Sequence, residues 1–145
     1  MWWIELHSIE DIYKLVEFEK EVHSEKDCMT VEEYKSWYDL GLRTTVLKDN
    51  NGEWKGSYQT INNGKDSILF AGFGRHPVYK GKGIGQILMN RLIARSKGKL
   101  LICETRHDNK SMIRLLENNG FVFVYDEIKE DDCWTWWKYE SKNRT

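Results

Sequence analysis

The sequence predicts an α/β fold in which four helices pack on a mixed β-sheet of about seven strands. The chain of 145 residues is 40% hydrophobic and 31% charged, which suits a globular protein with one core. Segments with strand and helix periodicity follow one another in the order β-α-α-β-β-β-α-β-α-β-β. Turn signals separate some consecutive strands and helices separate others, which favours both antiparallel and parallel neighbours. We expect a single domain over residues 1–145.

The first two elements are indicated by alternation and by a helix cap. Residues 2–6 alternate between two faces, as in a short strand. Ser8 stands at an N-cap position with Asp11 three residues later, which predicts a helix beginning at Ile9. Its apolar stripe consists of Ile9, Ile12, Tyr13, Leu15, Val16 and Phe18.

A second helix and three strands complete the first half of the chain. Thr30 and Glu33 have the spacing of a capping box, and Gly41 is placed to end the helix. Strands are expected at 42–48, 54–61 and 67–75. Asn-Asn-Gly sequences at 50–52 and 62–64 separate them, and these are hairpin turn signals.

The second half alternates helices with strands. Apolar residues at helical spacing predict a helix from Gly83 to Gly98, and 100–105 begins with a continuous apolar run typical of a buried strand. Another helix is expected from Asp108 or Asn109 to Gly120. The last two strands are expected at 121–125 and 133–139. The strand, helix and strand over 67–105 form a crossover candidate.

Several classes of protein are disfavoured by the composition. Cys28, Cys103 and Cys133 are far apart and form no CxxC pair, which argues against a disulfide scaffold and favours a reducing, cytoplasmic compartment. The four histidines show no paired metal spacing, so we expect no metal. No apolar run is long enough to cross a bilayer, and the first residues lack the features of a signal peptide, so no membrane association is expected.

Charge is distributed unevenly along the chain, although the net charge is −1. Residues 75–114 carry ten Lys or Arg against two acidic residues, whereas residues 1–74 carry eight against fourteen. A basic segment between acidic flanks favours an anionic ligand, with a chance clustering of surface lysines as the alternative. A protein that binds duplex DNA would more often be basic overall, so nucleic acid is not the expected partner.

Five of the eleven glycines lie within fourteen residues around Pro77, the one proline. They are Gly72, Gly74, Gly81, Gly83 and Gly85. Glycine lets backbone N–H groups approach a ligand, and a helix N-terminus favours phosphate. Neither the GxxxxGK[ST] nor the GxGxxG phosphate motif occurs here. The remaining pattern, a basic residue before Gly-x-Gly-x-Gly and a helix, predicts a site for an anion the size of pyrophosphate.

Residues 79–85, Tyr-Lys-Gly-Lys-Gly-Ile-Gly, resemble the acetyl-coenzyme A loop of the GCN5-related N-acetyltransferases, whose core pattern is Arg/Gln-x-x-Gly-x-Gly/Ala. Lys80 takes the basic position, and Gly83 and Gly85 take the two small ones. A second signature, a helix that begins at Asn109 and is closed by Gly-Phe, is similar to the family's as well. With the matching order of elements, the resemblance covers essentially the whole chain.

This resemblance implies a mostly antiparallel sheet splayed between its fourth and fifth strands, with acetyl-coenzyme A (acetyl-CoA) as co-substrate and an amine as acceptor. A main-chain N–H near Phe73 to Arg75 would polarise the thioester carbonyl. Backbone N–H groups of Lys80 through Gly85 would hold the pyrophosphate. The full set of implied contacts to the cofactor is Phe73, Gly74, Arg75, Lys80, Gly81, Lys82, Gly83, Ile84, Gly85 and Asn109. Gly72 and Gly74 independently suit a bulge in that strand, or a packing accommodation under a large aromatic side chain. Asn109 equally suits a helix cap.

The catalytic groups are less well specified by the resemblance. Glu104 follows a buried run and is the candidate general base, with His76 and His107 as alternatives. An ion pair with Arg75 or Arg106 is the alternative role for Glu104. The family's customary acid is a tyrosine four residues before Gly-Phe, where this chain has Leu116. Tyr125 is therefore the candidate acid, with Ser111 or water as alternatives. Leucine at this position is also compatible with a domain that binds coenzyme A without turnover.

Aromatic residues offer one further interpretation and one candidate surface. The seven tryptophans suggest base stacking, but Trp134, Trp136 and Trp137 share one strand and are more often core residues. Trp37 and Tyr38 on the second helix are candidates for the wall of the acceptor site. The acidic residues of the first half would suit a cationic acceptor, and exposed C-terminal strands would suit a homodimer.

Overall fold

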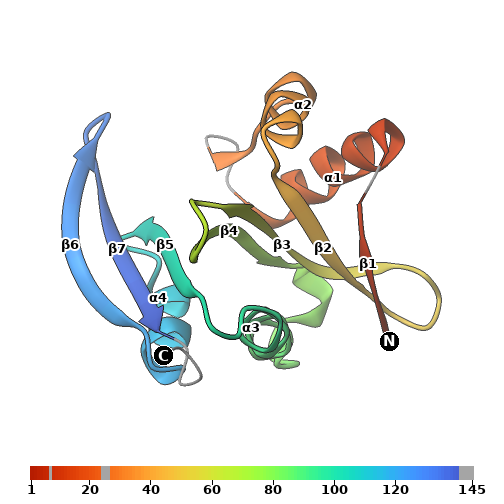
Figure 1. The fold of residues 1–145 in the computed structure, drawn as a ribbon. Coiled ribbons are helices and arrows are strands. Elements are labelled where there is room, and N and C mark those ends of the chain that lie inside the picture. The colour runs from red at the N-terminus through yellow and green to blue at the C-terminus, as the bar shows by residue number, and fades with distance from the viewer. Residues whose placement is uncertain (7, 24–26, 141–145) are drawn as a thin grey trace. The chain divides into compact units, whose positions relative to one another are not determined.

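The computed structural model describes residues 1–6, 8–23 and 27–140, and it contains the predicted elements in the predicted order (Figure 1). The strands are β1 (Trp2–Glu5), β2 (Arg43–Lys48), β3 (Trp54–Asn62), β4 (Ser67–Arg75), β5 (Leu100–Arg106), β6 (Val122–Lys129) and β7 (Asp132–Glu140). The helices are α1 (Ile9–Val22), α2 (Val31–Asp39), α3 (Ile84–Arg95) and α4 (Lys110–Asn118), with a short 3-10 helix η2 (Pro77–Tyr79).

The strands form a mixed sheet in the order β1-β2-β3-β4-β5-β7-β6, which confirms the predicted fold class. β5 runs parallel to β4 and antiparallel to β7. The parallel register of β4 and β5 comprises three pairs, from Ser67 opposite Leu100 to Leu69 opposite Ile102. β4 continues to Arg75 beyond the last of these pairs, which is the feature expected of a splayed fourth and fifth strand.

Side-chain caps begin the first two helices, as predicted. The Ser8 hydroxyl accepts a hydrogen bond from the Asp11 N–H at 3.2 Å. Thr30 and Glu33 form both bonds of a capping box, each at 3.1 Å. These caps satisfy N–H groups that have no partner within their own helix, so local sequence determines where α1 and α2 begin.

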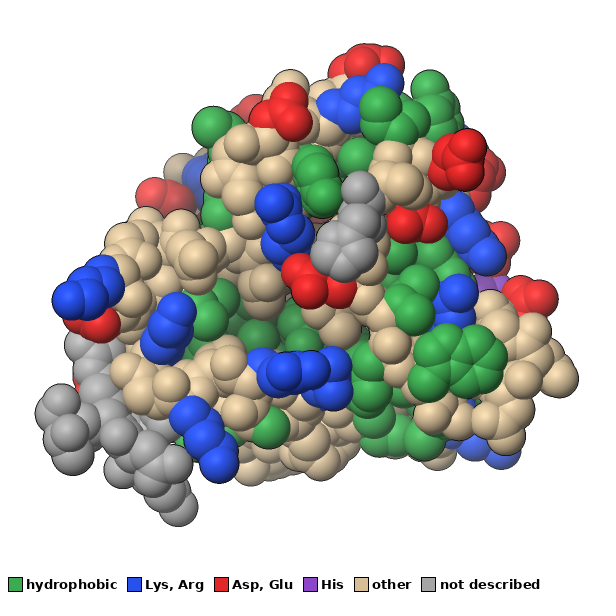
Figure 2. Space-filling model, turned by 45° about the vertical axis from the view of Figure 1, so that its right-hand side comes forward, with side chains coloured by type: hydrophobic (Ala, Val, Ile, Leu, Met, Phe, Trp, Pro, Cys, Tyr) green, Lys and Arg blue, Asp and Glu red, His purple; other side chains and the backbone are tan. Residues whose placement is uncertain are grey.

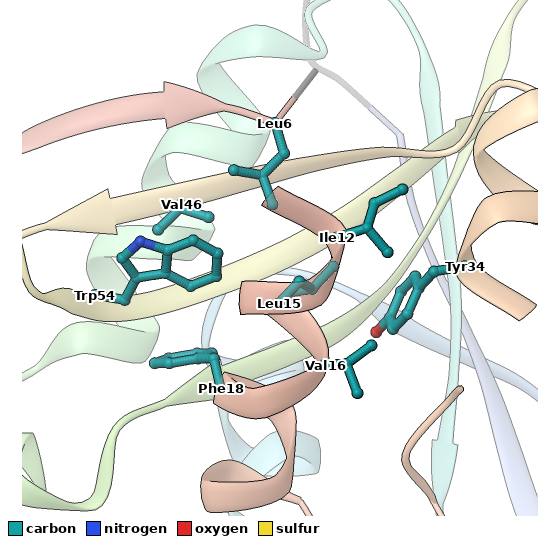
Figure 3. Packing of buried hydrophobic residues seen from close by; sticks show 8 residues of the cluster. All are labelled: Leu6, Ile12, Leu15, Val16, Phe18, Tyr34, Val46 and Trp54. Carbon is teal, nitrogen blue, oxygen red and sulfur yellow. The ribbon is translucent and has the colours of Figure 1, made fainter. Parts of the chain in front are cut away.

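The residues group into two compact units. The first comprises Met1–Ile61 and Gly72–Leu88. Its core joins α1 and α2 to β1, β2 and β3, and Figure 3 shows Phe18 of α1 beside Trp54 of β3 and the Tyr34 hydroxyl directed toward α1 near Val16. The buried cluster consists of Leu6, Ile12, Leu15, Val16, Phe18, Tyr34, Val46 and Trp54. The apolar stripe predicted for α1 supplies four of these side chains.

The second unit comprises Asn62–Ala71 and Met89–Thr145 and has its own core. Its buried side chains include Phe70, Met89, Leu92, Leu101, Cys103, Leu116, Phe121 and Trp137. Burial raises the pKa of the Cys103 thiol, so the thiol stays protonated at neutral pH. Of the three tryptophans of β7 that were expected in the core, Trp137 is buried. Trp134 and Trp136 are only half-buried, and cationic side chains lie over their rings.

The last hairpin differs from the sequence prediction. β6 and β7 extend to Lys129 and from Asp132, whereas the predicted strands were 121–125 and 133–139. Glu130 and Asp131 alone connect them, with φ of 50° and 67°. A two-residue turn with both φ values positive ordinarily uses Asn or Gly, and the absence of these residues hid the turn.

None of the helices that the structure describes has the length and hydropathy needed to span a membrane. The face drawn in Figure 2 carries charged side chains of both signs with apolar side chains exposed between them.

Candidate functional site

The glycine-containing end of β4 carries a one-residue bulge. The Asn63 N–H donates to the Ser67 carbonyl, and the His76 N–H donates to the Lys55 carbonyl, each at 2.9 Å. Between these two bonds the chain advances nine residues from Ser67 to His76, but only eight on the β3 side, from Lys55 to Asn63. The β4 side therefore contains one extra residue. Gly72 has a φ of +67°, which marks where the strand departs from extended geometry. A bulge of this kind re-aims the backbone groups next to it.

Packing leaves no room for larger residues at Gly72 and Gly74. A Cβ on Gly72 would lie 2.9 Å from Cγ of Gln59. A Cβ on Gly74 would lie 3.0 Å from Nε2 of His23 and would overlap the Val22 side chain. The packing interpretation of these glycines is therefore correct, but their neighbours are Gln59, Val22 and His23 rather than a large aromatic side chain.

A glycine-rich loop connects β4 to α3. The Lys80 N–H donates to the Pro77 carbonyl at 3.1 Å, and the Lys82 N–H donates to the Tyr79 carbonyl at 3.0 Å. Gly81 and Gly83 have φ values of +76° and +74°, and both are exposed. These left-handed conformations let the chain turn twice before α3 begins, at little steric cost for glycine.

The start of α3 presents backbone donors. Among the described residues, no backbone carbonyl accepts a hydrogen bond from the N–H of Gly81, Gly83, Ile84 or Gly85. Helix geometry supplies no acceptor for the first N–H groups of α3, and the helix dipole favours an anion there. The Lys80 and Lys82 side chains are exposed in the same loop. This arrangement can bind a phosphate-sized anion.

Three side-chain contacts hold this loop against the rest of the first unit. The Tyr79 hydroxyl donates to Oδ2 of Asp49 at 2.6 Å, and that hydrogen bond lowers the pKa of the Asp49 carboxyl. Nε2 of His76 lies 2.6 Å from Oε2 of Glu21 on α1. Lys55 Nζ lies 4.9 Å from the centre of the Tyr79 ring. Both ends of η2 are thus fixed, which limits the entropy that the loop loses when a ligand binds.

A buried carboxylate lies beneath the bulge. Glu19 on α1 is 3% exposed, and its Oε1 accepts hydrogen bonds from the Tyr34 hydroxyl at 2.8 Å and from Nε2 of Gln59 at 2.9 Å. Its Oε2 lies 2.9 Å from Nε2 of His23. Oε1 of Gln59 in turn accepts a hydrogen bond from the Thr44 hydroxyl. Three donors therefore satisfy one buried charge, as a stable buried carboxylate requires.

This network shifts the pKa values of two of its members. Burial alone would lower the pKa of the His23 ring, but Glu19 and the Gly72 carbonyl, which accepts a hydrogen bond from the ring, outweigh burial and raise it. Burial, with the Glu19 carboxylate beside the hydroxyl, raises the pKa of Tyr34 well above its ordinary range. His23 also caps the C-terminus of α1, where a positive charge is favoured.

We expect the free energy of unfolding to fall with rising pH through the titration of His23. The pKa of the ring in the folded protein is above its ordinary value of 6.5, so the protonated ring stabilises the fold. This contribution is complete below the ordinary value and is lost as the pH rises through the raised one. Urea unfolding of the wild type and His23→Gln at several pH values measures it. An unfolding difference between the two that stays constant with pH would contradict the prediction.

The other predicted site residues of the first unit lie near the loop or on α2. Phe73 stacks on Tyr58 with ring centres 5.3 Å apart, and Gly74 and Arg75 follow it at the end of β4. Trp37 is exposed on α2. The ring of Tyr38 lies 4.2 Å from the Arg43 guanidinium carbon, so this aromatic face is covered by a cation of its own chain.

Three predicted residues belong to the second unit. Glu104 on β5 is half-buried, and it pairs with Lys129 at 2.5 Å. Tyr125 on β6 is 48% exposed and stacks on Trp136 with ring centres 6.0 Å apart. Asn109 caps α4, where its side chain accepts a hydrogen bond from the Met112 N–H at 3.2 Å.

The position of the customary acid is a core position of this unit. Leu116 is fully buried, and its carbonyl accepts a hydrogen bond from the Phe121 N–H at 3.0 Å. Within the described residues, no group of His, Cys, Asp and Glu side chains is arranged to hold a metal ion.

Sequence reasoning missed Glu19 and His23. A signal was present, because Glu19 continues the spacing of Ile12, Leu15 and Val16 on the buried face of α1. An acidic residue at a core position requires buried partners, and His23 is one turn further along the same helix.

Comparisons with known proteins place the fold and the family. The chain superposes with a TM-score of 0.82 on the ribosomal-protein-S18-alanine N-acetyltransferase of Escherichia coli, at 18% identity over 96% of this chain and 92% of that one. The match to a phosphinothricin acetyltransferase from Sinorhizobium meliloti, solved with acetyl-CoA, has a TM-score of 0.74 at 16% identity over 100% and 91% of the two chains. A spermidine N-acetyltransferase from Vibrio cholerae gives 0.76 at 17% identity over 97% and 95%.

A search of curated protein sequences found no significant match. The model of the acetyltransferase (GNAT) family matches residues 7–121, which is most of the sequence. The chain therefore belongs to the GNAT acetyltransferase family.

Proposed function

We propose that the protein is an N-acetyltransferase that moves the acetyl group of acetyl-CoA to a primary amine by direct attack in a ternary complex. The observation that carries this proposal is the juxtaposition, in one unit, of the bulged end of β4 with the N–H groups and lysines that precede α3. The proposal treats residues 1–145 as one transferase domain. The three free cysteines, Cys28, Cys103 and Cys133, support a cytoplasmic location.

The loop residues would share the pyrophosphate of acetyl-CoA in two ways. The N–H groups of Gly81, Gly83, Ile84 and Gly85 are the proposed donors, since those of Lys80 and Lys82 are already bonded within the loop. The two lysines would instead contribute their ammonium groups, which neutralise phosphate charge. This division of roles refines the expectation drawn from the sequence.

The end of β4 would hold the reactive arm. The pantetheine would extend along Phe73–Arg75 by main-chain hydrogen bonds, as an added strand does. An N–H of this segment would donate to the thioester carbonyl as its oxygen becomes negative. Asn109 would contact the arm in addition to capping α4.

The chemistry requires a neutral amine and a stabilised leaving group. The amine nitrogen attacks the thioester carbonyl carbon, the carbon–sulfur bond breaks, and the products are the N-acetylated amine and coenzyme A as its thiol. One proton leaves the nitrogen and one reaches the sulfur. Glu104 is proposed as the acceptor of the first proton and Tyr125 as the donor of the second, with water as the alternative donor.

The acceptor is proposed to bind against α2, beside Trp37 and Tyr38. Acidic residues on α2, such as Glu32 and Glu33, support a cationic amine. The structural neighbours include N-acetyltransferases named for an alanine of ribosomal protein S18 and for spermidine. We propose a primary amine as the class.

Thiol release tests the function directly. Acetyl-CoA is incubated with the protein and a panel of polyamines, amino acids, peptides with free N-termini and aminoglycosides, and calorimetry measures binding alongside. Release that requires both protein and one class of amine supports the proposal. Binding of acetyl-CoA without release for any class supports a non-catalytic coenzyme A-binding domain. The apolar, fully buried Leu116 in place of the customary acid is the observation that favours this second candidate.

Glu104→Gln is expected to lower kcat by about two orders of magnitude, because the amide cannot accept the amine proton. Lys129→Gln, which removes the same ion pair from the other side, is the matched control and is expected to retain most activity. Initial rates at saturating substrates measure both. Full activity of the Glu104 variant would remove Glu104 from the mechanism.

A homodimer remains an expectation. β6 ends the order of strands, and Val122, Phe123, Val124, Tyr125 and Ile128 are exposed on it. An edge strand with exposed apolar side chains favours pairing with a second copy, which sedimentation equilibrium would measure.

A further inference from the structure

The peptide group between Gly72 and Phe73 is held from α1. The Gly72 carbonyl accepts a hydrogen bond from the His23 ring. The place that a Cβ on Gly74 would occupy lies 3.0 Å from His23 Nε2 and 3.3 Å from Cε1. The ring therefore lies against both glycines of the bulge and fixes the carbonyl end of the Gly72–Phe73 peptide.

The ring is itself fixed. Nε2 of His23 lies 2.9 Å from Oε2 of Glu19, and Tyr34 and Gln59 hold the other oxygen of that carboxylate. Glu19 thereby links α1 to α2, to β3 and, through His23, to β4. A charge this deeply buried and fully bonded has little freedom to move.

Because the peptide group is planar, fixing the Gly72 carbonyl also fixes the direction of the Phe73 N–H. No peptide bond among the described residues is cis, so the Gly72 carbonyl and the Phe73 N–H point in opposite directions. With the carbonyl turned toward His23, the N–H is turned away from α1. When the His23 ring is protonated, its hydrogen bond to the carbonyl also polarises the peptide and strengthens the N–H as a donor.

We propose that Glu19 and His23 are positioning residues for acetyl transfer, which orient the Gly72–Phe73 peptide so that the N–H groups of Phe73–Arg75 face the thioester. This inference rests on the proposed function. The hydrogen bonds of the ring go to Glu19 and to the Gly72 carbonyl, so the ring acts on the strand and does not exchange a proton with substrate.

Kinetics of matched variants test the inference. His23→Leu removes the contact with Gly72, whereas Tyr34→Phe removes a different hydrogen bond of Glu19 and leaves that contact in place. We expect His23→Leu to lower kcat about tenfold to a hundredfold with the acetyl-CoA Kd nearly unchanged, because misplacement of a reacting group acts on the chemical step. Tyr34→Phe is expected to lower the unfolding temperature and keep kcat. His23→Gln, which retains a neutral donor, should recover part of the loss and serves in place of His23→Leu if that variant does not fold.

A second measurement does not depend on turnover. With ¹⁵N-phenylalanine, the amide resonance of Phe73 reports on its peptide group directly. It should shift in His23→Leu or His23→Gln, stay in place in Tyr34→Phe, and in the wild type follow the protonation of His23. The charged or titratable groups that face the ring are Glu19 and Asp27, with Tyr34 bonded to Glu19.

The outcomes separate the two proposals. A wild type that releases no thiol with any amine removes the proposed function, and the Phe73 resonance then decides the positioning role alone. Equal kcat in the His23 and Tyr34 variants, or a Phe73 resonance unmoved by the loss of His23, overturns the positioning role even in an active enzyme.

Discussion

Replacing Glu19 with leucine is expected to lower the free energy of unfolding by about 3–5 kcal/mol, because the buried groups that bind its carboxylate would be left without a partner. Leucine fills much of the volume of glutamate but accepts no hydrogen bond. The Tyr34 hydroxyl, Nε2 of Gln59 and the His23 ring would each lose their acceptor. A buried donor without a partner costs far more than the net contribution of the hydrogen bond that it made.

Glu17→Leu is the matched control, since Glu17 lies on the same helix, is exposed, and pairs only with Lys20 in the contacts described. A change at such a position is expected to stay within about 0.5 kcal/mol. Urea unfolding of both variants at neutral pH gives the comparison. A cost at Glu19 no larger than that at Glu17 would mean that the buried network does not stabilise the fold.

The elements that the sequence predicted well are those determined by neighbours in the chain. Ser8 and the Thr30–Glu33 pair begin α1 and α2 because a cap needs only a side chain two or three residues from the N–H that it binds. The start of α3 is also determined locally, by the left-handed conformation of Gly83. The order of elements and the parallel β4–β5 pair then followed from the spacing of turns and helices.

What the sequence did not reveal depends on tertiary packing. The partners of Glu19 come from α2 and β3, and periodicity gives no information on which side chains meet across elements. The same limit applies to Glu104, whose partner Lys129 lies 25 residues away on β6. The candidate site was therefore predictable where backbone conformation defines it, at the glycines, and not where side-chain partners define it.

The loop before α3 provides the second large effect. Gly83→Val is expected to weaken binding of acetyl-CoA by about a hundredfold or more, although a Cβ on this residue would meet no atom within 4 Å. The reason is the backbone: at a φ of +74° a β-branched residue is strongly disfavoured, so the chain would leave this conformation. The N–H groups of Gly83 and Ile84 would then turn away from the pyrophosphate.

Gly64→Val separates this effect from backbone strain in general. Gly64 has a φ of +84°, equally open surroundings and a place in the hairpin between β3 and β4, outside the proposed cofactor loop. Both variants should lose similar stability, because the cost of leaving the left-handed region is paid at one residue in each. Calorimetric titration with acetyl-CoA should distinguish them, with affinity lost at Gly83 and kept at Gly64. Equal affinity in the two variants would locate the pyrophosphate away from this loop, and the basic segment around it would then need another ligand.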